Sequence, residues 1–131
     1  MQTFRIKTGR RAEFVDVTDI VRRAVAEAGV EDGVCCACVP HTTAGITINE
    51  SADPAVRQDI LAKLEELAPH NGDYRHSEGN ADSHIKAGLM GSSVVVPVES
   101  GRLALGTWQA IYFCEFDGPR TRSLIVKVIK G

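Results

Sequence analysis

The stretch Thr107-Trp-Gln-Ala-Ile-Tyr-Phe-Cys-Glu-Phe116 is the longest strand candidate in the chain, and it decides the fold class. Successive side chains of a strand point to opposite sides, so Ile111 and Phe113 share one face and Ala110 and Tyr112 share the other. Because both faces carry apolar groups, this strand is predicted to lie inside the sheet system.

Further strands are predicted on both sides of this stretch. Gly33 to Pro40 is apolar on both faces and is expected to be a central buried strand. The remaining strand candidates alternate in polarity or follow turn signals. They span Phe4–Thr8, Ala12–Val17, Gly45–Glu50, Ser93–Glu99, Arg102–Leu105 and Ser123–Lys130.

Helices are expected at three places. Thr18 can cap a helix that Gly29 ends, and Asp53 before Pro54 is a strong start for a second. An apolar stripe at helical spacing, made of Val56, Ile60, Leu61, Leu64 and Leu67, follows that second start. A third helix would follow Asn80 as its N-cap.

About seven or eight mostly antiparallel strands with two or three helices predict an α+β fold. We expect a β-sandwich in a single domain over residues 1–131. A doubly wound fold is disfavoured, because the second half of the chain lacks a helix after nearly every strand.

Composition excludes several classes of function. The net charge is -2, so no clustered positive face favours nucleic acid or an anionic membrane. No apolar run approaches the roughly 20 residues of a membrane span, and we expect a cytoplasmic protein. The four cysteines are expected to be small buried hydrophobes. The chain has no Gly-rich phosphate loop, which disfavours ATP, GTP and NAD.

The segment Tyr74-Arg-His-Ser-Glu-Gly-Asn-Ala-Asp-Ser-His84 concentrates the most site chemistry. If His76, Glu78 and Asn80 run extended, their side chains point to one side of the backbone. His84 would lie one helical turn after Asn80, so the two imidazoles and Glu78 can converge. Such a set suits a catalytic divalent metal, usually Zn²⁺ or Fe²⁺. The alternative is a solvated loop, in which His70 just upstream is also expected at the surface.

Two pairs of charged residues follow the long strand. Glu115 and Asp117 could hold a metal or act as a base, or they could be ordinary surface carboxylates. Arg120 and Arg122 could clamp a phosphate, or form ion pairs with those two carboxylates.

Four blocks occur in order along the chain: His41-Thr-Thr-Ala-Gly-Ile-Thr-Ile-Asn-Glu50, Tyr74–His84, Gly106-Thr-Trp-Gln109 and Cys114-Glu-Phe-Asp-Gly-Pro-Arg120. With these blocks the chain resembles the YjbQ-like family, whose members are described as secondary thiamine-phosphate synthase enzymes. The resemblance implies a β-sandwich subunit in a homotrimer, with a polar cleft near the subunit boundaries. It also implies weak coupling of a pyrimidine diphosphate to a thiazole phosphate.

The family's polar positions fall on His41, Asn49, Glu50, His76, Glu78, Asn80, His84, Gln109, Glu115, Asp117 and Arg120. Our hypothesis is a metal-assisted enzyme acting on a small phosphorylated metabolite, with zinc as the expected metal. His41, His76 and His84 are the candidate metal ligands. The candidate catalytic residues are Glu50, Glu78, Asn80, Glu115 and Asp117, and the candidate substrate-binding residues are Asn49, Gln109, Arg120 and Arg122.

Two alternatives come from other classes of protein. A binding or regulatory module would hold a phosphorylated metabolite without turnover. A structural trimer would instead bury the histidine cluster in its interface.

Overall fold

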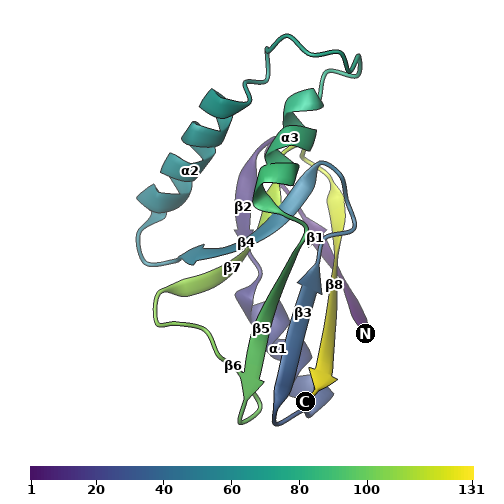
Figure 1. Ribbon diagram of the computed structural model, residues 1–131, viewed down its shortest axis with the longest axis vertical. Helices are drawn as coiled ribbons and strands as arrows, with labels where there is room; N and C mark the ends of the chain where they lie inside the picture. The colour runs from purple at the N-terminus through teal and green to yellow at the C-terminus, as the bar shows by residue number, and fades with distance from the viewer.

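The computed structural model describes all 131 residues and contains eight strands and three helices (Figure 1). The strands are β1 (Gln2–Lys7), β2 (Glu13–Asp16), β3 (Gly33–Cys38), β4 (Ala44–Glu50), β5 (Ser93–Glu99), β6 (Arg102–Leu103), β7 (Gln109–Glu115) and β8 (Thr121–Lys130). The helices are α1 (Thr18–Ala28), α2 (Pro54–Leu67) and α3 (Ala81–Met90). The predicted α+β fold is confirmed.

The strands form two antiparallel sheets. The larger sheet has the order β1-β8-β3-β5-β6, and the smaller sheet has the order β2-β7-β4. Strands β3 and β7 each have neighbours on both sides, as predicted. Strand β3 is not buried on both faces, however: Cys35 and Ala37 point into the core, whereas Val34 on the other face is 37% exposed because no element of the chain covers that face. In Figure 1, α2 and α3 lie at one end of the molecule and α1 lies behind the strands at the other.

Strand β7 separates two hydrophobic cores. Ile111 and Phe113 belong to the larger core, which lies between the two sheets and includes residues of α1. Tyr112 and Cys114 point the other way, into a smaller core that also holds Leu64 of α2 and Ala87 of α3. The predicted division of the β7 side chains between two faces is confirmed.

The helix starts are only partly as predicted. The Asp53 carboxylate accepts a hydrogen bond from the amide of Ala55 at 2.9 Å, so it caps α2. Thr18 does not cap α1, because it is already the first residue of the helix. The carboxylate of Asp16 accepts from the Thr18 amide instead, at 2.9 Å.

Helix α2 buries less than its pattern predicts. Only Leu64 is buried, and Leu67 is 63% exposed. Ile60 and Leu61 are half-buried and pack against the small core beside Leu64, so most of the expected stripe faces that core, and its last residue, Leu67, lies at the surface.

The cysteines divide in a similar way. Cys35 and Cys114 are buried, whereas Cys36 and Cys38 are half-buried. Burial raises the pKa of Cys35 to about 11, so this thiol stays protonated at neutral pH. None of the three helices is long and apolar enough to cross a membrane.

Candidate functional site

An open cleft of about 510 Å³ lies where the His41–Thr43 loop meets Arg120 and Arg122, at the start of β8. Its polar lining consists of His41, Thr42, Thr43, Arg120 and Arg122. Arg122 is paired with Glu115, so Arg120 and His41 are the groups that could meet an anion in this largely polar cleft, which we call the anion cleft.

The His41–Thr43 loop carries backbone groups that are not used within the chain. The amides of His41, Thr42 and Thr43 donate no hydrogen bond to any backbone or side-chain acceptor. Thr43 is only 5% exposed as a residue, and backbone amides in folded proteins usually have a hydrogen-bond partner. Successive free amides are a common way to bind anions, so the loop could supply donors to the cleft.

His41 is oriented by a backbone amide. Its Nε2 atom accepts a hydrogen bond from the Ser123 amide at 2.9 Å, so in the neutral ring the proton is on Nδ1. Burial, together with the nearby charge of Arg122, lowers the pKa of His41, which favours this neutral form. His41 therefore lies in the anion cleft as a hydrogen-bond donor.

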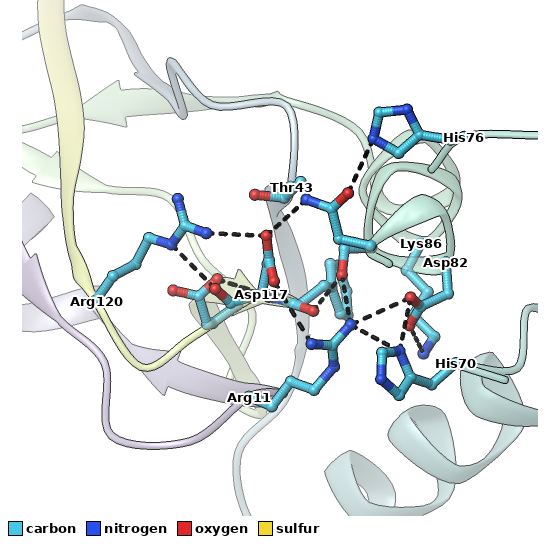
Figure 2. A network of polar contacts seen from close by, with 12 residues as sticks. Arg11, Thr43, His70, His76, Asp82, Lys86, Asp117 and Arg120 are labelled. Carbon is cyan, nitrogen blue, oxygen red and sulfur yellow. Dashed lines mark hydrogen bonds and ion pairs between the residues drawn. The ribbon is translucent and has the colours of Figure 1, made fainter. Parts of the chain in front are cut away.

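Asp117 holds Arg120 in place beside the same cleft (Figure 2). The Arg120 Nη2 atom donates to Asp117 Oδ2 at 2.9 Å, and its Nε atom donates to the Asp117 carbonyl at 3.0 Å. Arg120 Nη1 has no partner within the chain, and the side chain is 48% exposed. A guanidinium fixed on one edge and free on the other can bind an oxyanion at little cost in side-chain entropy.

The same Asp117 oxygen connects to the histidine segment. Asn80 Nδ2 donates to Asp117 Oδ2 at 2.9 Å, and Asn80 Oδ1 lies 3.0 Å from His76 Nε2 (Figure 2). Asn80 precedes α3 as predicted, but its side chain makes no cap bond because it makes these two contacts instead.

His76 and His84 come together, as predicted, although the segment between them is not extended. It is irregular and bends at Gly79, where φ is +79°. The two rings pack edge to face with centroids 5.2 Å apart, and Glu78 Oε2 lies 3.7 Å from His76 Nε2. Both histidines line a second cleft of about 360 Å³ with Tyr74 and Ile85.

The predicted three-histidine metal site is not assembled. His41 lines the anion cleft, whereas His76 and His84 line the second cleft. No group of three His, Cys, Asp or Glu side chains is arranged to hold a metal ion. The chain does bring two imidazoles together, with the Glu78 carboxylate 3.7 Å from His76 Nε2, whereas a catalytic zinc site uses three protein ligands.

Glu115 and Arg122 form a buried ion pair, with side chains 0% and 2% exposed. Arg122 Nε and Nη2 both donate to the Glu115 carboxylate, and Arg122 Nη2 also donates to the hydroxyl of Thr43 at 2.9 Å. The hydroxyl of Thr8 and the amides of Phe116 and Asp117 donate to the same carboxylate. Burial raises the pKa of Glu115, but these donors outweigh it and hold the pKa below its usual value.

Three of the predicted site residues lie at the far end of the small sheet. Strands β4 and β7 pair Ala44 with Glu115 at one end and Glu50 with Gln109 at the other. Six residue steps along a strand span about 20 Å. Asn49, Glu50 and Gln109 therefore do not reach the two clefts of the same chain.

A group of charged residues next to the site was not predicted. Arg11, in the turn between β1 and β2, reaches Asp82 at 3.2 Å and Asp117 at 3.6 Å (Figure 2). Lys86 also donates to Asp82, at 2.9 Å, and His70 Nδ1 lies 3.2 Å from it. Burial raises the pKa of Asp82, but its bonds to Lys86 and His70 outweigh this and lower it. The spacing of Asp82 and Lys86 by four residues on a helix was the one sequence pattern that could have predicted this group of charges.

Comparison with known proteins gives consistent matches along the whole chain. The family described as "UPF0047 protein YjbQ-like" matches residues 2–131. The Bacillus subtilis protein YugU is 50% identical over 131 residues, which cover 98% of each chain. MJ1081 of Methanocaldococcus jannaschii is 51% identical over 126 residues, or 96% of this chain and 91% of that one.

Solved structures agree with the fold. A family member from Clostridium acetobutylicum, described as uncharacterized, is 54% identical and has a TM-score of 0.97 over 98% of this chain and all of that one. A protein from Sulfolobus solfataricus, described as being of unknown function, is 35% identical with a TM-score of 0.95 over 99% and 96% of the two chains.

Proposed function

The chain belongs to the YjbQ-like UPF0047 family, and we propose its function from the geometry of its own site. The proposal is an enzyme that acts on a small phosphorylated metabolite. The phosphate would bind in the cleft lined by His41, Thr42, Thr43 and Arg120.

The observation that carries this proposal is the set of unused donors around one cleft. Arg120 Nη1, the Nδ1 atom of His41 and the amides of Thr42 and Thr43 have no acceptor within the chain. A phosphate offers several acceptor oxygens, so it can satisfy donors that arrive from different directions. A neutral His41 would add a hydrogen bond without the cost of burying a further charge.

His76 and His84 are the proposed acid–base groups. They lie in the second cleft, which adjoins the first through the Arg120–Asp117–Asn80–His76 chain of contacts. The second cleft also has Ala81 and Ile85 in its lining, so the non-phosphate part of the metabolite can pack there. Imidazole changes charge near neutral pH, which suits proton transfer to or from a bound substrate.

A metal-assisted form is a second candidate, favoured by the 5.2 Å approach of the two rings. His76 and His84 would supply two ligands and Glu78 could supply a third after a change of rotamer. A bound zinc would act as a Lewis acid or would activate water. Elemental analysis of untagged protein tests this form, since His76→Ala and His84→Ala should each abolish metal uptake.

Coupling of a pyrimidine diphosphate to a thiazole phosphate is the reaction that the family resemblance suggests. A phosphate cleft beside a partly apolar cleft is compatible with such a substrate pair. The alternative is a module that binds a phosphorylated metabolite without turnover. Tight binding without product, measured by calorimetry and chromatography on the same sample, would favour that alternative.

A homo-oligomer, in particular a trimer, is part of the proposal. Large apolar side chains are exposed on α2 and α3 (Leu67, Ile85 and Leu89) and on the large sheet (Val34, Val95 and Ile129). Copies that cover such surfaces would gain hydrophobic stabilisation. A second copy could also bring Asn49, Glu50 and Gln109 to the clefts, which the same chain does not. Analytical ultracentrifugation tests the oligomeric state. A cytoplasmic location remains a prediction.

The activity test uses a panel of phosphorylated metabolites that includes the pyrimidine diphosphate and thiazole phosphate pair. Product is followed by liquid chromatography with the wild type, Arg120→Gln and His76→Ala. Arg22→Gln is the matched control, because Arg22 is an exposed arginine of α1 whose ion pair with Asp19 lies outside both clefts. Turnover that survives unchanged in both site variants would refute the proposed site.

A further inference from the structure

Two side chains in series, Asp117 and Asn80, connect Arg120 of the anion cleft to His76 (Figure 2). Asp117, just after β7, accepts from Asn80 Nδ2 at 2.9 Å, and Asn80 Oδ1 lies 3.0 Å from His76 Nε2. The two contacts of Asn80 use the opposite ends of its amide. The orientation of that amide therefore decides which kind of group His76 faces.

The chemistry of Asp117 sets this orientation. A carboxylate only accepts hydrogen bonds, and Asp117 Oδ2 already accepts from Arg120 Nη2 at 2.9 Å, so this oxygen faces donors. The Asn80 NH₂ group must then face Asp117, which turns Asn80 Oδ1 toward His76. An amide oxygen only accepts, so His76 Nε2 must carry a proton.

We infer that Asn80 and Asp117 are positioning residues that hold neutral His76 in the Nε2–H tautomer, with the lone pair on Nδ1. Glu78 Oε2 lies 3.7 Å from the same Nε2 atom, which is beyond hydrogen-bond distance, so the Asn80 oxygen is the acceptor on that side. The inference deepens the proposed function. The tautomer of His76 does not depend on that function; only the catalytic role of His76 rests on it. If His76 is the base or a ligand, Nδ1 is the atom that takes the proton or binds the metal.

The test is the ¹⁵N spectrum of the His76 ring in chelator-treated protein at pH of about 8.5, well above the ordinary histidine pKa. Long-range ¹H–¹⁵N correlations separate a protonated ring nitrogen from an unprotonated one. In the wild type we expect two well-separated nitrogen shifts, with the protonated one assigned to Nε2. In Asn80→Ala we expect the two shifts to move toward each other, because the two tautomers then exchange.

Asp117→Ala tests the second link. It removes the oxygen that accepts from Asn80 Nδ2, so the orientation of Asn80 is no longer fixed and partial averaging is expected. Glu78→Gln is the control and should leave the spectrum unchanged, because Glu78 lies beyond hydrogen-bond distance of Nε2. Circular dichroism and the melting temperature check that each variant is folded.

An Nδ1–H ring or an averaged ring in the wild type would overturn the inference. So would an unchanged His76 spectrum in a folded Asn80→Ala variant. The measurement needs no substrate, so an inactive protein with the expected spectrum would contradict the proposed function and leave the tautomer assignment intact.

Discussion

Replacement of Arg122 by methionine should destabilise the protein strongly. Arg122 and Glu115 are almost fully buried, so the variant leaves a carboxylate in the interior without its counter-charge. Removing one partner of a buried ion pair costs about 3–5 kcal/mol. Thr8 and the amides of Phe116 and Asp117 still donate to Glu115, so we expect about 3 kcal/mol, the lower end of that range.

The matched control is Arg22→Met. Arg22 pairs with Asp19 at 3.3 Å on the surface of α1, where the two side chains are 58% and 90% exposed. Exposed ion pairs contribute about 0–1 kcal/mol, so this variant should remain close to the wild type. The same arginine is removed in both variants, and the two sites differ chiefly in burial.

The assay is urea unfolding at pH 7, followed by far-ultraviolet circular dichroism at one fixed protein concentration. The difference in unfolding free energy between the two variants should be at least 2 kcal/mol, taking the low estimate for Arg122 and the high one for Arg22. A difference below about 1 kcal/mol, with unchanged m-values, would refute our view of this pair as a structural element under the anion cleft.

Three further predictions concern neighbouring residues. The pKa of His41 is lower in the folded state than its ordinary 6.5, so the unfolded chain binds more protons and stability should fall as the pH drops below about 6.5. In His41→Asn the urea midpoint should lose this part of its pH dependence. The pKa of Glu115 is also lowered, so its stabilisation is present above pH 4.5 and is lost in more acidic solution, and Glu115→Gln should flatten that part of the acid unfolding curve even though it is less stable at pH 7. Lys86→Met leaves Asp82 buried with only Arg11 and His70, and should lower the unfolding free energy by about 2–4 kcal/mol. Lys63→Met removes an exposed ion pair and should cost less than about 1 kcal/mol, and equal losses in the two variants would contradict the view that Lys86 stabilises a buried carboxylate.

The fold class could be predicted because it depends on local patterns. Apolar residues on both faces of β7 require packing on both sides, and the structure has a core on each. The approach of His76 and His84 could also be predicted, because both lie in one short segment that ends in the first turn of α3. The extent to which α2 is buried could not be predicted, because an apolar stripe does not show how much of it a neighbouring element covers.

The rest of the site depends on contacts between distant parts of the chain. Arg11 reaches Asp82 across 71 residues, and no sequence pattern marks that contact. The position of Asn49 and Glu50 could have been found from strand length, since an antiparallel pair separates its two ends. The orientation of His41 depends on the Ser123 amide, 82 residues away, and only the assembled sheets make that contact.

The most direct test of the central claim is titration of the ¹⁵N-labelled protein with inorganic phosphate at constant ionic strength. We predict that the amide signals of Thr42 and Thr43 shift with saturation. Loss of a charged hydrogen bond is worth about 1.5–3 kcal/mol, so Arg120→Gln should weaken binding by about 10- to 150-fold. Arg22→Gln should bind phosphate like the wild type. Shifts that spare Thr42 and Thr43, or equal affinities for Arg120→Gln and Arg22→Gln, would contradict the assignment of this cleft to phosphate.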